Sequence, residues 1–313
     1  MQTVEAHHKL TYSDNVKMVA QQMMNPLRNA VTIVPCDGEA KNMADLIEEL
    51  DYIEGEDYSR TNPENPPKRH RRWLVRPTDI SSGQLITKEE KFDQAMDPTS
   101  VLFRAHIKAC ERGVFDRILG VRKKKSEPAT LAEGGIFGKV AEGKTPGALV
   151  ALPTGNYVSS DYGETPGTHV GLTLPKMRRA TEAMELEDFG LETEDEIWGM
   201  ITPKQKTDLI NLAVETGKNL NPFEVKNIKE GKPGELLGIN WLFTNRLPVD
   251  SNGRRLIPLW SKANIICGMW QDLEGQIFND GSSRNLPRIL VDCYPTCGRV
   301  EDEGVRIIRC EET

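Results

Sequence analysis

The feature that most limits how this 313-residue chain can fold is one long helical segment that follows a basic, turn-rich stretch. Residues 97 to 120 (DPTSVLFRAHIKACERGVFDRILG) predict a helix, because Asp97 can accept a hydrogen bond from a first-turn amide and Pro98 suits the first helical position. Gly120 can end the helix. The apolar residues form one stripe: Phe103, Ile107, Cys110, Val114 and Ile118. The stripe is typical of an ordinary core helix; the extended stretch before it also suits a part that reaches neighbouring subunits.

Two adjacent strips of opposite charge precede the helix. Residues 42 to 59 contain no Lys or Arg. Beyond the breaker-rich TNPENPP (61 to 67), basic residues surround a tryptophan. The strips are either solvated surfaces or a hairpin paired with itself, or they belong to an extended loop whose charges meet the opposite sign on an adjacent subunit. On the last interpretation the candidate inter-subunit contacts are Arg69, Arg71, Arg72, Trp73, Glu48, Glu49, Glu54 and Glu56.

The remaining patterns predict an α+β protein. Helices are expected at 13 to 24, 174 to 189 and 203 to 216, and strands at 31 to 34, 197 to 203, 236 to 243, 255 to 260, 264 to 270, 288 to 294 and 305 to 310. Residues 133 to 171 are rich in Gly and Pro, which predicts loops and hairpins at a sheet edge. A long helix followed by strands interleaved with fewer helices indicates the α+β class.

One segment imitates a phosphate-binding loop. Residues 138 to 145 (GKVAEGKT) match G-x-x-x-x-G-K-[ST], and residues 289 to 292 (ILVD) imitate the strand that carries a magnesium-binding aspartate. A working loop needs a buried strand before it and a helix after it. Two glycines occupy the place of that strand, and Pro146, Gly147 and Pro153 leave no room for the helix. We therefore expect a glycine-rich surface loop, with Lys144 facing solvent or an interface.

The composition, and the lack of a recognisable catalytic motif, restrict the function further. The net charge of −7 argues against a broad phosphate-binding surface, and the basic run at 122 to 125 is more typical of a solvated loop than of a DNA contact. The six cysteines lack zinc-site spacing, so buried thiols are expected. The five histidines match no catalytic signature, although residues distant in sequence could converge on an undetected enzyme site. No apolar run could span a bilayer, and the polar N-terminus indicates a soluble, cytosolic product.

The order RRW, extended stretch, DPTS and long helix resembles the major capsid (coat) proteins of tailed bacteriophages with the Hong Kong 97-type fold. Residues 7 to 31 (HHKLTYSDNVKMVAQQMMNPLRNAV) are similar to the N-terminal arm of that family. The family's closing segments are resembled, in the same order, by 240 to 248 (NWLFTNRLP), 261 to 277 (SKANIICGMWQDLEGQI) and 298 to 312 (GRVEDEGVRIIRCEE).

The resemblance implies a set of domains. They are an N-terminal arm at 1 to 35, an extended loop at 50 to 95, a peripheral domain at 97 to 189 and 286 to 313 with the spine helix 97 to 120, and an axial domain at 190 to 285. Because the arm and loop are polar and rich in breakers, we expect deletion of residues 1 to 30 to leave a folded chain that assembles poorly.

The resemblance also implies a structural function. The chain would self-assemble through hexamers and pentamers into an icosahedral shell around a double-stranded DNA genome, without sequence-specific DNA binding, catalytic residues, cofactor, metal or membrane. Scaffold, portal and decoration proteins would be further partners, with assembly in the host cytoplasm and the virion capsid as the final location. The alternatives are a non-capsid DNA-associated protein that uses the two basic clusters and, further away, a phosphate-loop nucleotide-binding enzyme.

Overall fold

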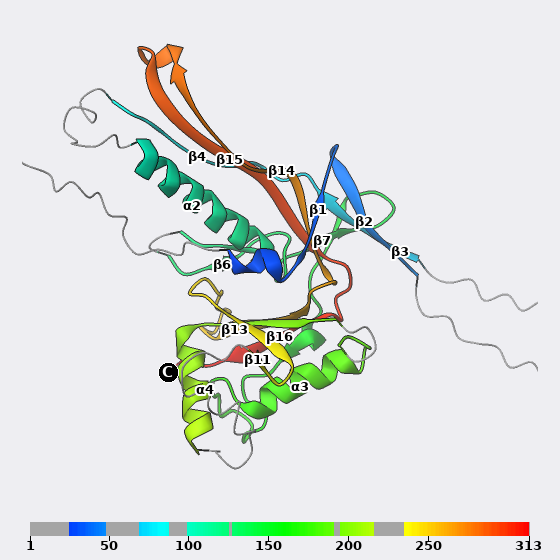
Figure 1. Cartoon of the computed structure of the whole chain (residues 1–313). Coiled ribbons are helices and arrows are strands. Elements are labelled where there is room, and N and C mark those ends of the chain that lie inside the picture. Colours follow the sequence, from blue (N-terminus) through cyan, green and yellow to red (C-terminus); the bar gives the residue numbers. More distant parts are fainter. Residues whose placement is uncertain are drawn as a thin grey trace, which may run out of the picture. The chain divides into compact units, whose positions relative to one another are not determined.

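The chain was described with a computed structural model, which covers residues 25–47, 69–87, 99–124, 127–190, 195–215 and 235–312. Within these ranges helices and strands form an α+β fold (Figure 1). In chain order the elements are η1 (Pro26–Asn29), β1 (Thr32–Pro35), β2 (Ala40–Ile47), β3 (Arg69–Val75), β4 (Ile80–Leu85), α2 (Thr99–Leu119), β5 (Val121–Arg122), β6 (Thr130–Leu131), β7 (Val140–Glu142), β8 (Ala148–Val150), η2 (Thr154–Asn156), β9 (Tyr157–Val158), α3 (Leu174–Glu185), β10 (Ile197–Ile201), α4 (Pro203–Glu215), β11 (Glu235–Leu236), β12 (Ile239–Phe243), β13 (Arg255–Ser261), β14 (Ile265–Asp280), η3 (Gly281–Ser283), β15 (Leu286–Arg299) and β16 (Val305–Cys310).

The chain forms two compact units. Among the described residues, the first unit contains Asn25, 78–87, 99–114 and 271–294, and the second contains the rest. Helix α2 and strands β14 and β15 have residues in both units.

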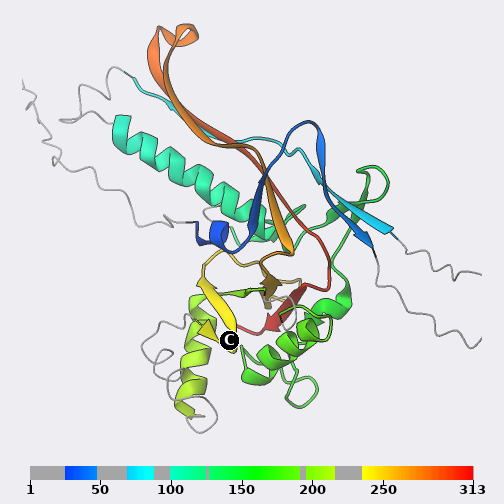
Figure 2. The ribbon, with the colours of Figure 1, turned by 45° about the vertical axis from the view of Figure 1, so that its right-hand side comes forward.

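In the first unit, α2 lies along strands β4, β14 and β15 (Figures 1 and 2). The Cys110 thiol donates to the Val291 carbonyl over 3.4 Å. A Cβ atom at Gly113 would lie 2.7 Å from the Ile80 side chain, so the absence of a side chain lets helix and strand approach closely. Strand β15 pairs with β4 in antiparallel register, from Arg288 opposite Leu85 to Cys293 opposite Ile80.

The predicted long helix is confirmed for residues 99 to 119, and its apolar stripe is increasingly buried toward its C-terminus. Cys110, Val114 and Ile118 are buried. Gly120 ends the helix as predicted: its φ is +75°, and its N–H donates to the carbonyls of Asp116 and Arg117 over 2.9 and 3.2 Å. Asp97 and Pro98 lie outside the described residues, as does the helix predicted at 13 to 24.

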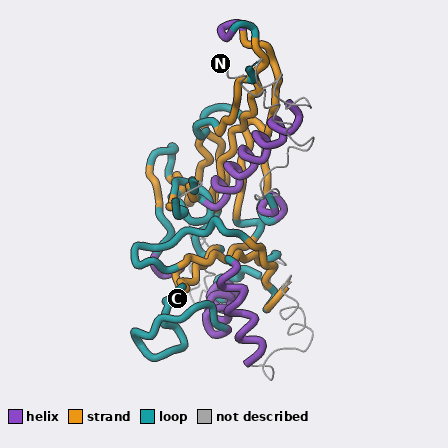
Figure 3. Tube along the Cα trace, turned by 90° about the vertical axis from the view of Figure 1, so that its left-hand side faces the viewer, coloured by secondary structure: helices purple, strands orange, loops and turns teal. Residues whose placement is uncertain are grey.

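The second unit is built on a six-stranded mixed sheet in the order β11-β12-β10-β13-β16-β9. Helix α3 packs on β16 and β9, and α4 packs on β10 (Figure 3). The buried residues of α3 recur at helical spacing because one side of the helix faces the sheet: Leu174, Met177, Ala180 and Met184. Trp260 of β13 is fully buried, and its Nε1–H donates to the Ala30 carbonyl over 2.8 Å.

Smaller sheets complete this unit. Strand β1, predicted at 31 to 34 and found at Thr32–Pro35, pairs in parallel with residues 266–269 of β14. Strands β2, β3, β7 and β8 form a four-stranded antiparallel sheet in that order, and β5 pairs with β6. The hairpin of β7 and β8 lies at the edge of its sheet, which confirms the sequence interpretation of the Gly- and Pro-rich region.

The remaining predicted elements are confirmed, with changes at their ends. Strand 236 to 243 is wrong as a single strand, because Leu237 and Gly238 have φ of +56° and +69° and form the turn between β11 and β12. Helix α3 ends at Glu185 instead of 189, four residues early, and Asp188 beyond it has φ of +61°. Strands β14 and β15 are longer than predicted, because they continue as a hairpin whose residues 272–279 are mostly exposed and mix apolar with polar side chains instead of forming a continuous apolar run.

One strand lies apart from its expected domain. Residues 305 to 310 were expected in the peripheral domain, but β16 pairs with β13, which belongs to the expected axial domain. All residues of β16 except Arg309 are buried, so this strand is central to the core of the second unit.

Candidate inter-subunit contact surface

The two charge strips meet in the hairpin of β2 and β3. Antiparallel pairing places Asp45 opposite Arg71, and the Arg71 Nη2 donates to Asp45 Oδ2 over 3.1 Å. The guanidinium of Arg71 beside Asp45 lowers the pKa of that carboxyl. The described ends of the strips therefore form a hairpin paired with itself. Four of the predicted contacts, Glu48, Glu49, Glu54 and Glu56, lie outside the described residues.

The side chains of β3 alternate between two faces of the sheet, as in any strand. Arg69, Arg71 and Trp73 share one face, and the Arg71 guanidinium lies over the Trp73 ring at 5.5 Å from its centroid. Trp73 is held in place by a 2.8 Å hydrogen bond from its Nε1–H to the Gly143 carbonyl. We call this side of the sheet the outer face; it also contains Val75, and Leu149 across from Ala141.

Arg72 points to the opposite face and is only 8% exposed. Its guanidinium forms a two-pronged pair with Asp302, with Nη2 to Oδ2 at 2.8 Å and Nη1 to Oδ1 at 3.2 Å, and its Nε lies 3.5 Å from Glu142. Arg72 thus differs from the other predicted contacts: buried charges require partners, and Arg72 has them inside its own fold. Alternation along the strand separates it from Arg69 and Arg71.

Asp302 joins Arg72 to a second buried cation. The Arg299 Nε donates to Asp302 over 3.0 Å, and its Nη1 donates to the carbonyls of Gly135 and Ile136 over 3.2 and 3.1 Å. Burial lowers the pKa of Arg299, an effect opposed by the carboxylate of Asp302. Asp302, in the turn before β16, thus binds Arg72 of β3 and Arg299 of β15, and Arg299 in turn binds the glycine-rich loop after β6.

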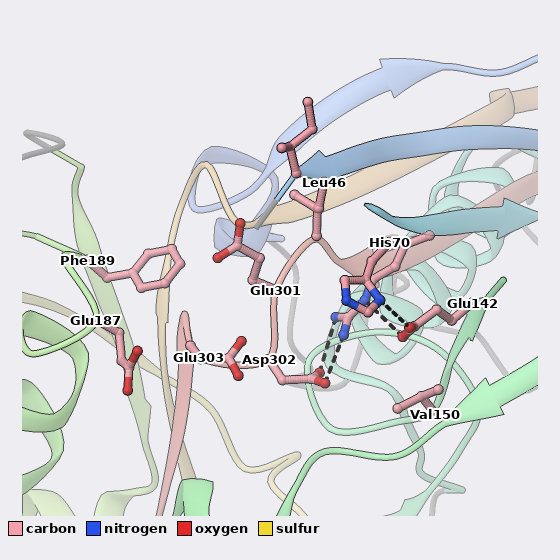
Figure 4. A pocket seen from close by; sticks show the side chains of 11 residues that line it. Leu46, His70, Glu142, Val150, Glu187, Phe189, Glu301, Asp302 and Glu303 are labelled. Carbon is pink, nitrogen blue, oxygen red and sulfur yellow. Dashed lines mark hydrogen bonds and ion pairs between the residues drawn. The ribbon is translucent and has the colours of Figure 1, made fainter. Parts of the chain in front are cut away.

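An open pocket of about 630 Å³ lies on this inner side of the sheet (Figure 4). Its walls combine apolar and acidic side chains from β2, β3, β7, β8, the turn after α3 and the turn before β16. We call it the acidic pocket; it is lined by Leu46, Ile47, His70, Arg72, Glu142, Val150, Glu187, Phe189, Glu301, Asp302 and Glu303.

The pocket has surplus negative charge. Glu142 and Asp302 pair with Arg72, and His70 lies 3.4 Å from Glu142. Glu187, Glu301 and Glu303 form no ion pair with any residue in the described ranges; Arg306 interacts with Glu187 and Glu303 only at longer range. Burial, reinforced by the neighbouring Glu303, raises the pKa of Glu301, an effect that Arg72 opposes.

The phosphate-loop imitation does not have the geometry of a nucleotide site. Residues 138–145 contain β7, which leads through a turn into β8, so a strand follows where a helix is required. The Gly143 amide donates to the Arg71 carbonyl over 2.9 Å and is not available to a phosphate. Residues 289–292 belong to β15 and pair with β4. Lys144 is exposed, in agreement with the surface-loop interpretation.

The six cysteines are buried thiols, as expected. Burial raises the pKa of Cys110 to about 11 and that of Cys310 to about 12, which keeps both protonated and unreactive near neutral pH. Across the described ranges, no group of three or more His, Cys, Asp or Glu side chains is placed to hold a metal ion. No helix within those ranges combines the length and apolar character needed to cross a membrane.

Sequence reasoning missed the acidic pocket and the partners of Arg72. Glu301, Asp302 and Glu303 form a short acidic run that was visible in the closing segment. The structural role of this run depends on the pairing of Asp302 with Arg72, which is 230 residues away in the chain. No local sequence pattern indicates a pairing over that separation.

Comparison with known protein families and solved structures gives matches over nearly the whole chain. A family model described as "Phage capsid protein" matches residues 4–312. No curated protein sequence matches significantly. Solved structures with a similar fold include the capsid of Myoviridae phage XM1, with TM-score 0.67, 11% identity and 99% of each chain covered. The capsid of Ralstonia phage GP4 has TM-score 0.64 and 11% identity, with 100% of this chain and 98% of that chain covered. The capsid of a native GTA particle has TM-score 0.64 and 12% identity, with 100% and 99% covered.

Proposed function

Because the chain belongs to the phage capsid protein family and is a major capsid protein, a structural component of the virion shell, we propose that it assembles through hexamers and pentamers into an icosahedral shell. The observation that carries this proposal is the family match over residues 4–312. The same match removes the basis for the alternatives, a non-capsid DNA-associated protein and a nucleotide-binding enzyme.

The shell would enclose double-stranded DNA without reading its sequence. The net charge of −7 supports this, because a subunit that neutralised many phosphates would hinder the packing and release of the genome. Assembly in the host cytoplasm, with scaffold, portal and decoration proteins as further partners, belongs to the same proposal.

The parts of the subunit would then have separate tasks. Residues 1 to 35 would act as an arm and 50 to 95 as an extended loop toward neighbours, with α2 as the spine of a peripheral domain. Residues 190 to 285 would supply most of the axial domain at the centre of each capsomer. The packing of Leu27 and Ala30 in the second unit suggests that the reaching part of the arm ends before Pro26.

Contacts between subunits would use the outer face. Arg69 and Arg71 are exposed cations beside Trp73, which suits docking on acidic residues of a neighbour. The acidic strip with Glu48, Glu49, Glu54 and Glu56 is one candidate acceptor for them.

Electron microscopy of the purified chain tests the proposal. We expect closed shells, or six- and five-membered rings under conditions that prevent closure. Sedimentation of the same sample should show a large particle instead of a single subunit. A folded chain that stays monomeric or dimeric at every concentration and salt condition, with and without co-expressed phage assembly factors, would contradict the proposed assembly.

A further inference from the structure

The two faces of the β2-β3-β7-β8 sheet differ in charge. Alternation along β3 places Arg69 and Arg71 on the outer face and His70 and Arg72 on the inner face. The inner face forms part of the acidic pocket, where Glu187, Glu301 and Glu303 form no ion pair with the described residues and interact with Arg72 and Arg306 only at longer range. The outer face therefore has two exposed cations, Arg69 and Arg71, against one exposed carboxylate, Asp45, which pairs with Arg71, while the hollow on the other side has surplus negative charge.

The two surfaces also match in their apolar character. On the outer face Val75 and Leu149 are 44% and 49% exposed and lie near the half-buried Trp73. In the pocket, Leu46, Val150 and Phe189 provide the apolar wall; Ile47, which is opposite Arg69 in the sheet, lies at its rim. Contiguous apolar side chains rimmed by charge are typical of a surface that binds protein.

The outer face and the acidic pocket cannot contact each other within one subunit, because they lie on opposite sides of the same sheet. In two copies, the outer face of one subunit can contact the acidic pocket of the other. A contact between different patches on identical subunits is heterologous, and it leaves one free patch of each kind at the ends of a chain of subunits. Such contacts close into rings when the rotation between copies allows it.

We propose that the outer face of one copy, centred on Arg69, Arg71 and Trp73, docks over the acidic pocket of a second copy. This inference rests on the proposed assembly of the chain into capsomers, and it names the acceptor surface that the proposal leaves open. Arg69 and Arg71 approach Glu187 and Glu303, while Val75 and Leu149 cover the apolar wall.

Charge exchange tests the pairing directly. Arg69→Glu with Arg71→Glu should raise the concentration needed for assembly by about tenfold or more, because a weak contact is repeated throughout the particle. Glu187→Arg with Glu303→Arg should have a similar effect; both carboxylates are exposed and lie outside the network of Arg72, Asp302 and Arg299, and thermal unfolding of this variant checks the longer-range effect on Arg306. The four-residue exchange should restore most of the assembly, which is measured by sedimentation and microscopy.

Two comparisons give the experiment its specificity. Arg178→Glu with Arg179→Glu is the matched control, because it reverses two exposed arginines on α3, and it should leave assembly near the parent level. Thermal unfolding of each unassembled variant should stay close to that of the parent, which separates a lost contact from a damaged fold. Exchange of the acidic strip, Glu48→Arg with Glu49→Arg, should not rescue the Arg69 and Arg71 double variant.

The possible results divide clearly. Rescue by the pocket exchange supports the inference. Normal assembly of both double variants, failure of the four-residue exchange to rescue, or rescue by the acidic-strip exchange would overturn the pocket as acceptor while leaving the capsid proposal intact. Absence of particles from the unmodified chain would instead refute the proposed assembly itself.

Discussion

Arg71 and Arg72 are neighbours in β3, yet their guanidinium groups lie in opposite environments. Arg71 is exposed and pairs with Asp45 on the surface, where such pairs are individually worth about 0–1 kcal/mol. Arg72 is buried between Asp302 and Glu142. Removal of one partner from a buried pair leaves the other charge uncompensated, so the same substitution should have different consequences at the two positions.

Arg72→Ala should therefore lower the free energy of unfolding of the unassembled chain by about 3 kcal/mol or more. Arg69→Ala, on the outer face, should change it by less than about 0.5 kcal/mol. Urea denaturation followed by circular dichroism measures both. Equal effects of the two substitutions would show that Arg72 does not have the buried role assigned to it.

Glu312 gives a prediction about pH. Its carboxylate accepts from Arg255 over 2.9 and 2.7 Å and from Gln205 over 2.9 Å, and the hydrogen bonds from Arg255 are the main cause that lowers its pKa below 4.5. A carboxyl with a lower pKa in the folded state stabilises the fold fully above its unfolded pKa, near 4.5, and loses this contribution as pH falls through the folded value.

Glu312→Gln should accordingly reduce stability at pH 7 by about 1–2 kcal/mol, a range reduced for the partial exposure of the pair. The difference between variant and parent should shrink as pH falls below about 4.5, the ordinary value. Thermal melting at pH 7, 5 and 3.5 measures the trend. A difference that stays constant across this range would mean that the ionisation of Glu312 is not involved.

Among the elements, α2 depends on Gly120, the residue that ends it, as much as on its apolar stripe. Gly120 has φ of +75°, and a Cβ atom there would lie 2.2 Å from the Gly134 carbonyl oxygen and 2.8 Å from the Gly138 amide nitrogen. Gly38 has nearly the same φ, +74°, with nothing within 4 Å of the corresponding position. Substitution of Gly38 therefore reports the cost of the backbone conformation alone, and substitution of Gly120 reports that cost together with the cost of a steric clash.

Gly38→Ala should cost about 1 kcal/mol, the usual penalty of a left-handed conformation for a residue with a side chain. Gly120→Ala should cost at least about 2 kcal/mol more, because rigid backbone atoms of the loop after β6 must move. Chemical denaturation of both variants and the parent provides the comparison. Similar losses at the two sites would contradict close packing of this loop on the end of α2.

At the scale of the whole molecule, the N-terminal region divides near residue 25. Leu27 and Ala30 are fully buried in the second unit, and the Ala30 carbonyl accepts the Trp260 indole N–H. The sequence predicts that a chain lacking residues 1 to 30 still folds; the burial of Leu27 and Ala30 adds that this deletion should lower its stability. Removal of Leu27 exposes its apolar neighbours, and removal of Ala30 leaves a buried donor without its acceptor.

A chain lacking residues 1 to 24 should unfold within about 1 kcal/mol of the parent but assemble poorly, since the polar arm contributes mainly between subunits. A chain lacking residues 1 to 30 should lose about 3 kcal/mol or more in addition, the sum of the Leu27 and Ala30 contributions. Calorimetry and sedimentation of the two truncations measure stability and assembly separately. Normal particles from the shorter truncation would show that the arm is not required.

Local chemistry was enough to predict several elements of this protein. Asp97, Pro98 and Gly120 predicted α2, and the glycines and prolines around Lys144 excluded a phosphate site, because capping, positive φ and missing N–H groups act over a few residues. The order of segments along the chain also indicates the capsid family.

Only the tertiary structure decided which charges face inward. Residues 69 to 73 form one basic strip in the sequence, but β3 turns Arg72 into the core and leaves Arg69 and Arg71 outside. The acidic run at 301 to 303 became part of a pocket because the turn before β16 lies beside β3 and β7. Pairing over such sequence separations depends on the packing of whole sheets. The residues on either side of Arg72 or Asp302 contain no pattern that predicts this packing.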